Sequence, residues 1–321
     1  MARLLARVAP WLPSVRSHAE QVDATGTAAT GPDASSTTAA GAAVVDGFVT
    51  LDKEHNEALG RLVDLDPTSN VFIASHLEAS RGLSPSYAGG EVIGIFRAGE
   101  LVSACWAGVN LVPIGVSPDD GAALGTYLGT SGRKFSSIFG PADAVLAIWS
   151  TLRLHSPEPF DVRPQQPLLA ITGTPKVDPA PGLRFTREDE LDVIVPACAA
   201  MFEEEVGYSP FTGGGEHYRR RVASLVRRQA SLADFDEDGQ VIFKAELGTV
   251  SSTTVQIQGV WMNPAYRGQG LSARYLAAVV LAAQQRAPVV SLYVNSFNTR
   301  ALSAYRTVGF EEVGTFATVL L

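Results

Sequence analysis

Apolar and polar positions along the chain predict the same order of elements twice. In the first series we expect strands at residues 44–51, 91–97, 101–107, 111–116, 135–139 and 167–172, and helices at 54–64, 69–79, 118–130 and 142–154. In the second we expect strands at 183–186, 231–236, 241–249, 254–262 and 289–295, one or two strands within 310–321, and helices at 191–205, 216–229, 271–285 and 299–308. This repetition indicates an internal duplication.

Composition changes along the chain suggest where the domains begin and end. Residues 24–43 are almost all Ala, Thr, Ser, Gly, Asp and Pro, which cannot form a packed core, so we expect 1–43 to be a disordered tail. A segment rich in Pro and Gly at 173–182 reads as a linker. The prediction is therefore an α/β (α+β) fold with two domains, at 44–172 and 183–321.

The overall composition is that of a globular protein, with 46% hydrophobic and 18% charged residues. A net charge of -8 and a pI of about 5.2 argue against nucleic acid or an anionic membrane as a partner. Cys105 and Cys198 belong to no metal or redox motif, and the histidines show no ligand spacing, so we predict no metal site. Two buried thiols in a reducing compartment favour a cytoplasmic protein.

One loop carries the most chemical information. A hydrophobic strand runs into Pro264, a short loop with Arg267, Gly268 and Gly270 follows, and an apolar helix begins near Leu271. This order gathers unpaired backbone N–H groups and the positive end of a helix dipole around one point, and Arg267 adds a full charge. The pattern predicts a site for a pyrophosphate, although an ordinary strand-to-helix turn would use glycines in the same way.

Two motifs resemble those of the GNAT family of acyl-CoA-dependent N-acyltransferases. The family's phosphate loop, Arg/Gln-x-x-Gly-x-Gly/Ala, matches Arg267-Gly268-Gln269-Gly270-Leu271-Ser272, with Ser272 in place of the usual Gly or Ala. A later motif, Asn-x-x-Ala-x-x-x-Tyr-x-x-x-Gly-Phe, matches Asn298, Ala301, Tyr305, Gly309 and Phe310. The resemblance covers about residues 182–321, and the whole chain is similar to actinobacterial two-domain proteins with a degenerate GNAT-like half before an intact one.

The resemblance implies a fold and a donor. It implies tandem GNAT-like domains, each with a mixed, mostly antiparallel sheet flanked by helices. It implies that acyl-CoA, most simply acetyl-CoA, donates an acyl group to an amine on a small molecule or a protein. The cofactor-binding residues would be Val260, Trp261, Met262, Arg267, Gly268, Gln269, Gly270, Leu271, Ser272, Asn295, Asn298 and Tyr305.

The resemblance also implies catalytic roles. Tyr305 would protonate the leaving thiolate, for which a phenol is a suitable acid, although a tyrosine in mid-helix can also be core packing. Many members carry a basic carboxylate on the fourth strand, and residues 254–258 have none. Glu246, on the neighbouring strand and the same face as Lys244, is our candidate base, with an internal salt bridge as the alternative. Acids at 203–205 near the acceptor side, or a water relay, are further alternatives.

The first half lacks this phosphate loop. Its corresponding turn reads Val116-Ser117-Pro118-Asp119-Asp120, and two carboxylates at a helix start repel a pyrophosphate. We therefore expect only the second half to bind CoA. The predicted function is an N-acetyltransferase, with a mycothiol-synthase-like tandem acyltransferase or a non-catalytic acyl-CoA sensor as alternatives.

Overall fold

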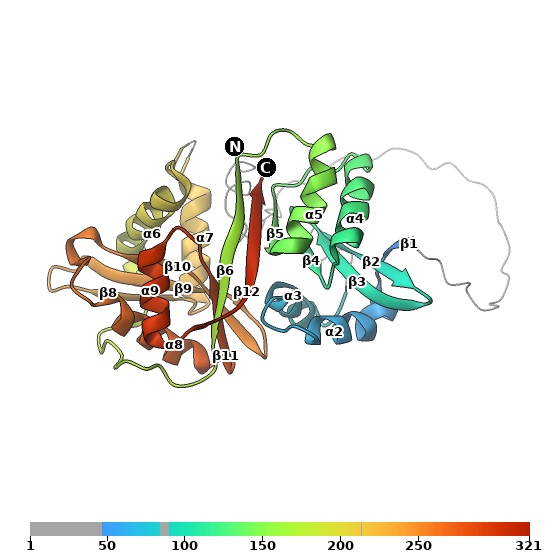
Figure 1. The fold of residues 1–321 in the computed structure, drawn as a ribbon. Coiled ribbons are helices and arrows are strands. Elements are labelled where there is room, and N and C mark those ends of the chain that lie inside the picture. The colour runs from blue at the N-terminus through green and yellow to red at the C-terminus, as the bar shows by residue number, and fades with distance from the viewer. Residues whose placement is uncertain (1–46, 84–89, 213) are drawn as a thin grey trace, which may run out of the picture.

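The computed structural model describes residues 47–83, 90–212 and 214–321. The predicted tail at 1–43, and residues 44–46 of the predicted first strand, lie outside the described residues. The described strands form one continuous sheet in the order β1-β2-β3-β4-β5-β12-β6-β11-β10-β9-β8-β7. Figure 1 shows this sheet running through the molecule, with helices on its faces.

The first half has the predicted order of elements, with short 3-10 turns added. Its strands are β1 (Gly47–Thr50), β2 (Glu91–Arg97), β3 (Glu100–Ala107), β4 (Asn110–Ile114), β5 (Ser137–Pro141) and β6 (Asp161–Ile171). Its helices are α2 (Asn56–Asp64), α3 (Val71–Ser80), α4 (Pro118–Thr130) and α5 (Ala142–Leu152), and its turns are η1 (Lys53–His55) and η2 (Arg153–His155). The last strand begins six residues earlier than predicted, because Pro164 and Pro167 are accommodated within it.

The second half repeats the order. Its strands are β7 (Arg184–Phe185), β8 (Ser231–Phe235), β9 (Val241–Val250), β10 (Thr254–Met262), β11 (Val289–Tyr293) and β12 (Glu311–Leu320). Its helices are α6 (Leu191–Val206), α7 (Glu216–Arg227), α8 (Ser272–Gln284) and α9 (Thr299–Val308), with turns η3 (Glu188–Glu190) and η4 (Pro264–Tyr266). The repeated order of elements is thus confirmed, and one strand, not two, closes the chain.

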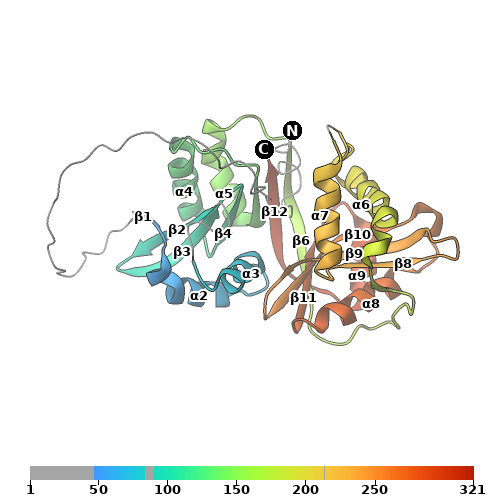
Figure 2. The same ribbon diagram turned by 180° about the vertical axis from the view of Figure 1, so that it is seen from behind.

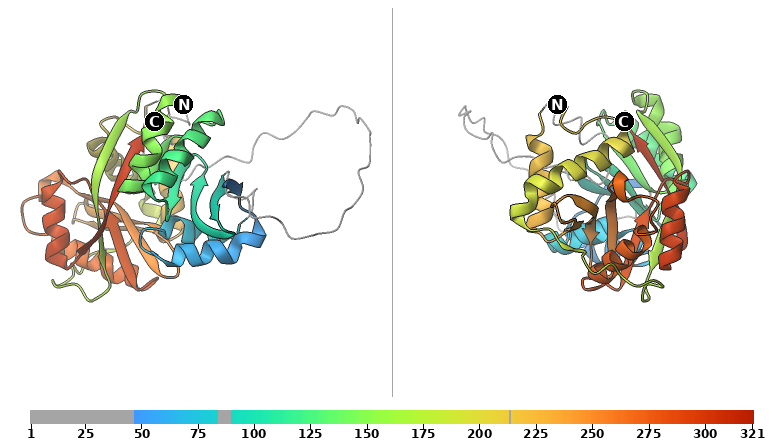
Figure 3. Two further views of the ribbon diagram at one scale, coloured as in Figure 1. Left: turned by 45° about the vertical axis from the view of Figure 1, so that its right-hand side comes forward. Right: turned by 90° about the vertical axis from the view of Figure 1, so that its left-hand side faces the viewer.

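The halves exchange their last strands. β12 pairs antiparallel with β5 of the first half, whereas β6 pairs antiparallel with β11 of the second half. The two exchanged strands also pair with each other, and they run side by side in every view (Figure 1, Figure 2 and Figure 3). Each half is therefore completed by a strand from the other, and the sheet has no break between them.

Helices cover both faces of the second half. Figure 1 shows α8 and α9 in front of its strands, and Figure 2, from behind, shows α6 and α7 on the opposite face. The alternation of the strands sends Val255 and Ile257 to the α8–α9 face, where they join one buried core. Trp261 joins a second core, with α6 and α7. Helix α3 of the first half contacts β9 and β10, so the two halves also pack through helices.

Candidate functional site

A bulge interrupts β10 where it leaves β11. The two strands pair in parallel only through Thr254–Gln256, opposite Val289–Ser291. The pairing of β10 with β9 shifts register between Gln258 and Trp261, and Gly259 there has a φ of +57°. Such a bulge re-aims the side chains that follow it. Among the described strands, β10 has no partner other than β9 beyond Gln256, so its backbone groups on the β11 side lie outside the sheet ladder.

The predicted loop residues follow directly after this strand. Gly268 and Gly270 have φ angles of +79° and +73°, which side chains with a Cβ rarely adopt. A Cβ at either position would meet nothing within 4 Å, so backbone conformation and not close packing calls for glycine here. Gln269 between them donates from Nε2 to the Ala265 carbonyl at 3.2 Å, which ties the loop to η4.

Helix α8 begins without a cap. Leu271 is its N-cap residue and makes no side-chain hydrogen bond to the helix start. The first bonds of the helix run from the N–H groups of Arg274 and Tyr275 to the Leu271 carbonyl, at 3.1 and 3.2 Å. The N–H groups of Ser272 and Ala273 therefore have no acceptor within the helix. Together with the helix dipole, they make this turn attractive to an anion.

The Arg267 side chain is engaged within the protein. Its Nε donates to the Met262 carbonyl at 2.8 Å, and its NH2 donates to both carboxylate oxygens of Glu204 at 2.8 and 2.9 Å. Trp261 donates from Nε1 to the same carboxylate at 3.0 Å. The full positive charge that we expected from Arg267 is thus already paired with a carboxylate from the end of α6. An anion at the predicted site would therefore meet backbone N–H groups rather than an unpaired Arg267 charge.

Both predicted asparagines are positioned by polar contacts. Asn298 caps α9, because its Oδ1 accepts from the Ala301 N–H at 3.1 Å, as the sequence motif indicates. Asn295, after β11, accepts from Gln166 Nε2 on the exchanged strand β6 at 2.9 Å. Gln166 in turn accepts from Thr318 of β12 at 2.6 Å. A chain of hydrogen bonds through both exchanged strands therefore orients Asn295.

Tyr305 lies on the buried face of α9. Its side chain is 6% exposed, and its ring meets Phe310 edge-on at a centroid distance of 5.8 Å. Burial, with a smaller contribution from the Glu205 charge, raises the pKa of the phenol, so the hydroxyl stays protonated at neutral pH. No hydrogen-bond partner of this hydroxyl occurs among the described residues, whereas Tyr275 donates to Asp234 at 2.8 Å. The Tyr305 hydroxyl is thus a donor that the protein itself leaves unused.

Two family models match the chain, one running from the first half into the start of α6 and one within the second half. Residues 90–194 match a domain of unknown function, DUF4081. Residues 199–310 match the acetyltransferase (GNAT) family, and this range holds the bulge, the loop, Asn298 and Tyr305.

Residues 199–310 are a GNAT acetyltransferase domain.

Solved structures share the fold of most of the chain, across both halves, at low sequence identity. A Drosophila protein is 12% identical with a TM-score of 0.60, covering 86% of this chain and 99% of its own. A GCN5-related N-acetyltransferase from Sphaerobacter thermophilus is 17% identical with a TM-score of 0.54, covering 86% and 96%. A GNAT-family acetyltransferase from Colwellia psychrerythraea is 13% identical with a TM-score of 0.50, covering 85% and 98%. No curated protein matches the chain.

Glu246 of the GNAT domain lies in a buried ion cluster. It is 0% exposed and accepts from Lys244 Nζ at 2.6 Å, Gln258 Nε2 at 3.1 Å and Arg221 NH2 at 3.4 Å. Burial alone would raise the pKa of this carboxyl, but the cations Lys244 and Arg221 outweigh it and hold the pKa at about 2. A carboxylate held ionised in this way accepts protons poorly. The geometry matches the internal salt bridge that was the alternative, and a catalytic role for Glu246 stays a prediction.

Glu205 occupies a more open position at the end of α6. Its side chain is 31% exposed, and Arg163 of β6 donates to its Oε1 at 3.4 Å. Loss of water around the carboxylate raises the pKa of Glu205, and this effect outweighs the lowering by Arg163. The Glu205 charge also raises the pKa of the Tyr293 and Tyr305 phenols, in each case less than burial does. Sequence reasoning named Glu205 only as one of three acids and missed Arg163, which no local motif marks.

Two polar side chains lack partners at the last rung between β10 and β11. The Cα atoms of Gln256 and Ser291 are paired there, and Gln256 Nε2 and Ser291 Oγ are buried without a hydrogen bond. Gln256 shares a strand face with Gln258, which bonds to Glu246. Buried polar atoms are nearly always hydrogen-bonded. A polar ligand on the α6–α7 face of the GNAT domain would therefore gain hydrogen bonds from these two unpaired side chains.

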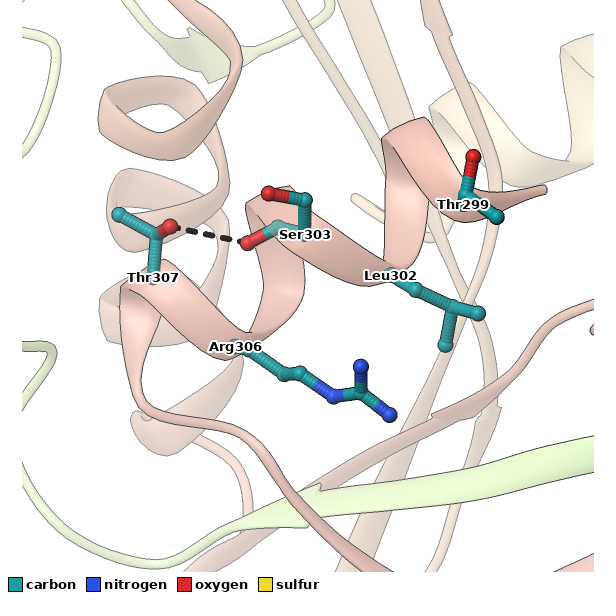
Figure 4. A pocket seen from close by; sticks show the side chains of 5 residues that line it. All are labelled: Thr299, Leu302, Ser303, Arg306 and Thr307. Atoms are coloured by element: carbon teal, nitrogen blue, oxygen red, sulfur yellow. Dashed lines mark hydrogen bonds between the residues drawn. The ribbon is translucent and has the colours of Figure 1, made fainter.

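A separate depression of about 430 Å³ lies along α9. Figure 4 shows the side chains that line it, which are Thr299, Leu302, Ser303, Arg306 and Thr307. None of them belongs to the loop after β10 or to the predicted catalytic pair, so this depression is distinct from the candidate site.

No group of three His, Cys, Asp or Glu side chains is placed to hold an ion within residues 47–83, 90–212 and 214–321. Both cysteines are buried, and burial raises the pKa of Cys198 to about 11 and that of Cys105 to about 12. Within the same ranges, no helix has the length and hydropathy that a membrane crossing requires.

Proposed function

We propose that the second half transfers an acyl group, most simply acetyl, from acyl-CoA to an amine. One observation carries this proposal: the strand that leaves its neighbour after Gln256 leads directly into an uncapped helix start through two glycines with positive φ. The family match over residues 199–310 supports an acetyltransferase. The cytoplasm is the compartment we propose, since acyl-CoA is available there.

The donor would lie along β10. Its diphosphate would accept from the N–H groups between Gly268 and Ala273, where the helix dipole adds about half a positive charge. The pantetheine arm would bond to the backbone of Val260–Met262, which β11 leaves unpaired. One of these N–H groups would polarise the thioester carbonyl, as oxyanion-hole donors do.

The chemistry needs one proton acceptor and one proton donor. As the amine nitrogen bonds to the thioester carbon, it gains positive charge and must lose a proton, for which we assign Glu205. As the carbon–sulfur bond breaks, the sulfur takes the electron pair and needs a proton, for which we assign Tyr305. A carboxyl with a raised pKa at the end of α6 and, on α9, a phenol without a hydrogen-bond partner among the described residues would supply the two functions.

The acceptor would be a cationic amine. The end of α6 carries three consecutive exposed acids, Glu203, Glu204 and the proposed proton acceptor Glu205 itself. Of these, Glu204 is paired with Arg267, and Glu205 is only loosely held by Arg163. The negative field favours amines that arrive protonated. Such an amine first releases one proton to solvent to become nucleophilic, and its second proton passes to Glu205 as the nitrogen–carbon bond forms.

Replacing Tyr305 with Phe tests the mechanism. We expect the turnover of acetyl-CoA on a panel of amines to fall by about 10²-fold or more, because the leaving sulfur loses its acid. The affinity for acetyl-CoA, measured by calorimetry, should stay unchanged. Tyr127→Phe on the surface of the first half is the matched control, because Tyr127 is 40% exposed and distant in sequence from every predicted site residue.

Each outcome has one interpretation. Equal turnover in the Tyr305→Phe protein would remove Tyr305 from the mechanism. Binding of acetyl-CoA without turnover of any amine would favour a sensor over an enzyme. Absence of CoA binding by the folded wild-type protein would overturn the whole proposal.

A further inference from the structure

The strand exchange brings one cation of the first half to the proposed proton acceptor. Arg163 lies on β6, and its Cα pairs with Thr318 of β12, the other exchanged strand. Its side chain is 8% exposed, which for an arginine requires partners on the protein. It is the only side chain of the first half, within the residues that the structure describes, that bonds to Glu205.

Three contacts fix the guanidinium. Nε donates to Asp161 Oδ2 at 2.8 Å, NH1 donates to Glu205 Oε1 at 3.4 Å, and NH2 donates to the Glu205 backbone carbonyl at 3.3 Å. The planar fork therefore holds both the carboxylate and a carbonyl in the last turn of α6. The last carbonyls of a helix receive no hydrogen bond from an N–H group of the same helix. A cation beside them also interacts favourably with the negative end of the helix dipole.

The contact to the carboxylate is long and single. At 3.4 Å with one oxygen, it orients the Glu205 side chain without the tight two-oxygen clamp that Glu204 forms with Arg267. The second Glu205 oxygen has no partner among the described residues. A carboxylate held by one oxygen and open at the other is suited to accept a proton from a bound amine.

We propose that Arg163 is a positioning residue of the acyl-transfer site, so that the first half supplies the group that orients the proton acceptor Glu205. This inference rests on the proposed function. It gives the first half a direct part in the reaction, in addition to its packing against the second. The strand exchange is what makes this possible, because an unexchanged β6 would lie next to β5, away from β11 and α6.

The charged and titratable groups around Glu205 come from four elements. Arg163 lies on β6, Lys244 and Glu246 on β9, Tyr293 on β11 and Tyr305 on α9. Arg163 and Lys244 lower the pKa of Glu205, whereas Glu246 raises it. Removing the nearest cation should therefore raise the pKa of Glu205 further, so that the base becomes active only at higher pH.

The direct test is a pH titration of the Glu205 carboxyl by ¹³C NMR in protein labelled at glutamate side chains, with Glu205→Gln to assign the signal. In Arg163→Met we expect the titration midpoint to rise by about one unit. In parallel, for an amine that turns over, the acidic limb of the pH profile of kcat/KM should shift to higher pH by the same amount as the NMR midpoint. The KM for acetyl-CoA should stay constant. Arg61→Met is the control, because Arg61 forms an exposed ion pair on α2. It should change neither the Glu205 midpoint nor the pH profile of kcat/KM.

The results separate this inference from the proposed function. An unchanged Glu205 midpoint and pH profile in Arg163→Met would overturn the role of Arg163. If no amine turns over, the NMR midpoint still decides whether Arg163 controls Glu205, and CoA calorimetry decides the function separately. If Arg163→Met does not fold, Arg163→Lys takes its place: retention of the charge should keep the midpoint within a few tenths of a unit, and loss of the fork should lower kcat several-fold. Unchanged kcat in that variant would also overturn the inference.

Discussion

The two halves use the same turn in opposite ways. In the first half, Ser117 caps α4 by accepting from the Asp120 N–H at 3.2 Å, and Asp120 also pairs with Arg97. In the second half, α8 begins after Leu271 with no side-chain cap and no acid in its first turn. One helix start is thus capped by a side chain and carries acids, whereas the other has neither. The comparison shows how a few residues change the first turn of a helix that occupies the same place in a repeated order of elements.

The inner faces of the halves also differ. Beside β3, the rings of Phe72, His76, Trp106 and Phe139 pack on one another, with Phe72 and Phe139 edge-on at 5.5 Å. Beside β9, the corresponding face holds the buried charges of Lys244, Glu246 and Arg221. The first half has filled this region with rings, which suits a structural role. The second half keeps ionic groups there, which are costly to bury and are maintained only by mutual pairing.

The largest expected effect comes from breaking the ionic face. In Lys244→Met, Glu246 loses its closest partner in a fully buried position, so we expect the free energy of unfolding to fall by about 3–5 kcal/mol. Chemical denaturation measures this change. The triple variant Lys244→Met, Glu246→Leu, Arg221→Met should recover most of the loss, because it leaves neither an unpaired carboxylate nor an unpaired guanidinium. Equal destabilisation in the single and triple variants would show that packing and not charge maintains this face.

The next effect concerns the open helix start. Ser272→Asp places a carboxylate where the first half has its acids, and we expect the affinity for CoA to fall by about 100-fold through repulsion of the diphosphate. The fold should remain stable, because an acid at a helix start is favourable. Calorimetry with CoA provides the measurement, and Ser272→Ala is the neutral control. Undiminished affinity in Ser272→Asp would mean that the diphosphate binds elsewhere.

The smallest effect compares the two serines directly. Ser117→Ala removes a cap and should lower the free energy of unfolding by about 1 kcal/mol. Ser272→Ala should change it by a few tenths at most, since the Ser272 hydroxyl contacts only the Met262 sulfur, at 3.5 Å. Thermal unfolding of the two variants side by side checks this. Equal losses would contradict the difference between the two helix starts.

Local patterns predicted the parts of the fold that depend on neighbours in sequence. The glycines of the loop, the Asn298 cap and the shared strand face of Lys244 and Glu246 are all confirmed, because each depends on spacing over a few residues. The order of elements in the two halves is confirmed for the same reason.

Contacts between distant segments escaped prediction. The pairing of Arg267 with Glu204 joins residues 63 positions apart, and no motif in either segment indicates this contact. The exchange of β6 and β12 depends on which strand edges meet across the sheet, and the local pattern of neither strand carries a signal for that choice. Arg163 was missed because the prolines around it made residues 161–166 look unlike a strand.

The interleaved strands also determine the order in which parts of the sheet can form during translation. Glu311–Leu320 must be translated before the edge of β5 can be covered, although β5 itself emerges much earlier from the ribosome. Domains ordinarily fold as units, from the N-terminal side onward, while the chain is being made. Here β5 lacks the strand partner that it has in the complete sheet until residue 320 has been added, so this edge of the first half reaches its native pairing only after the second half has been made.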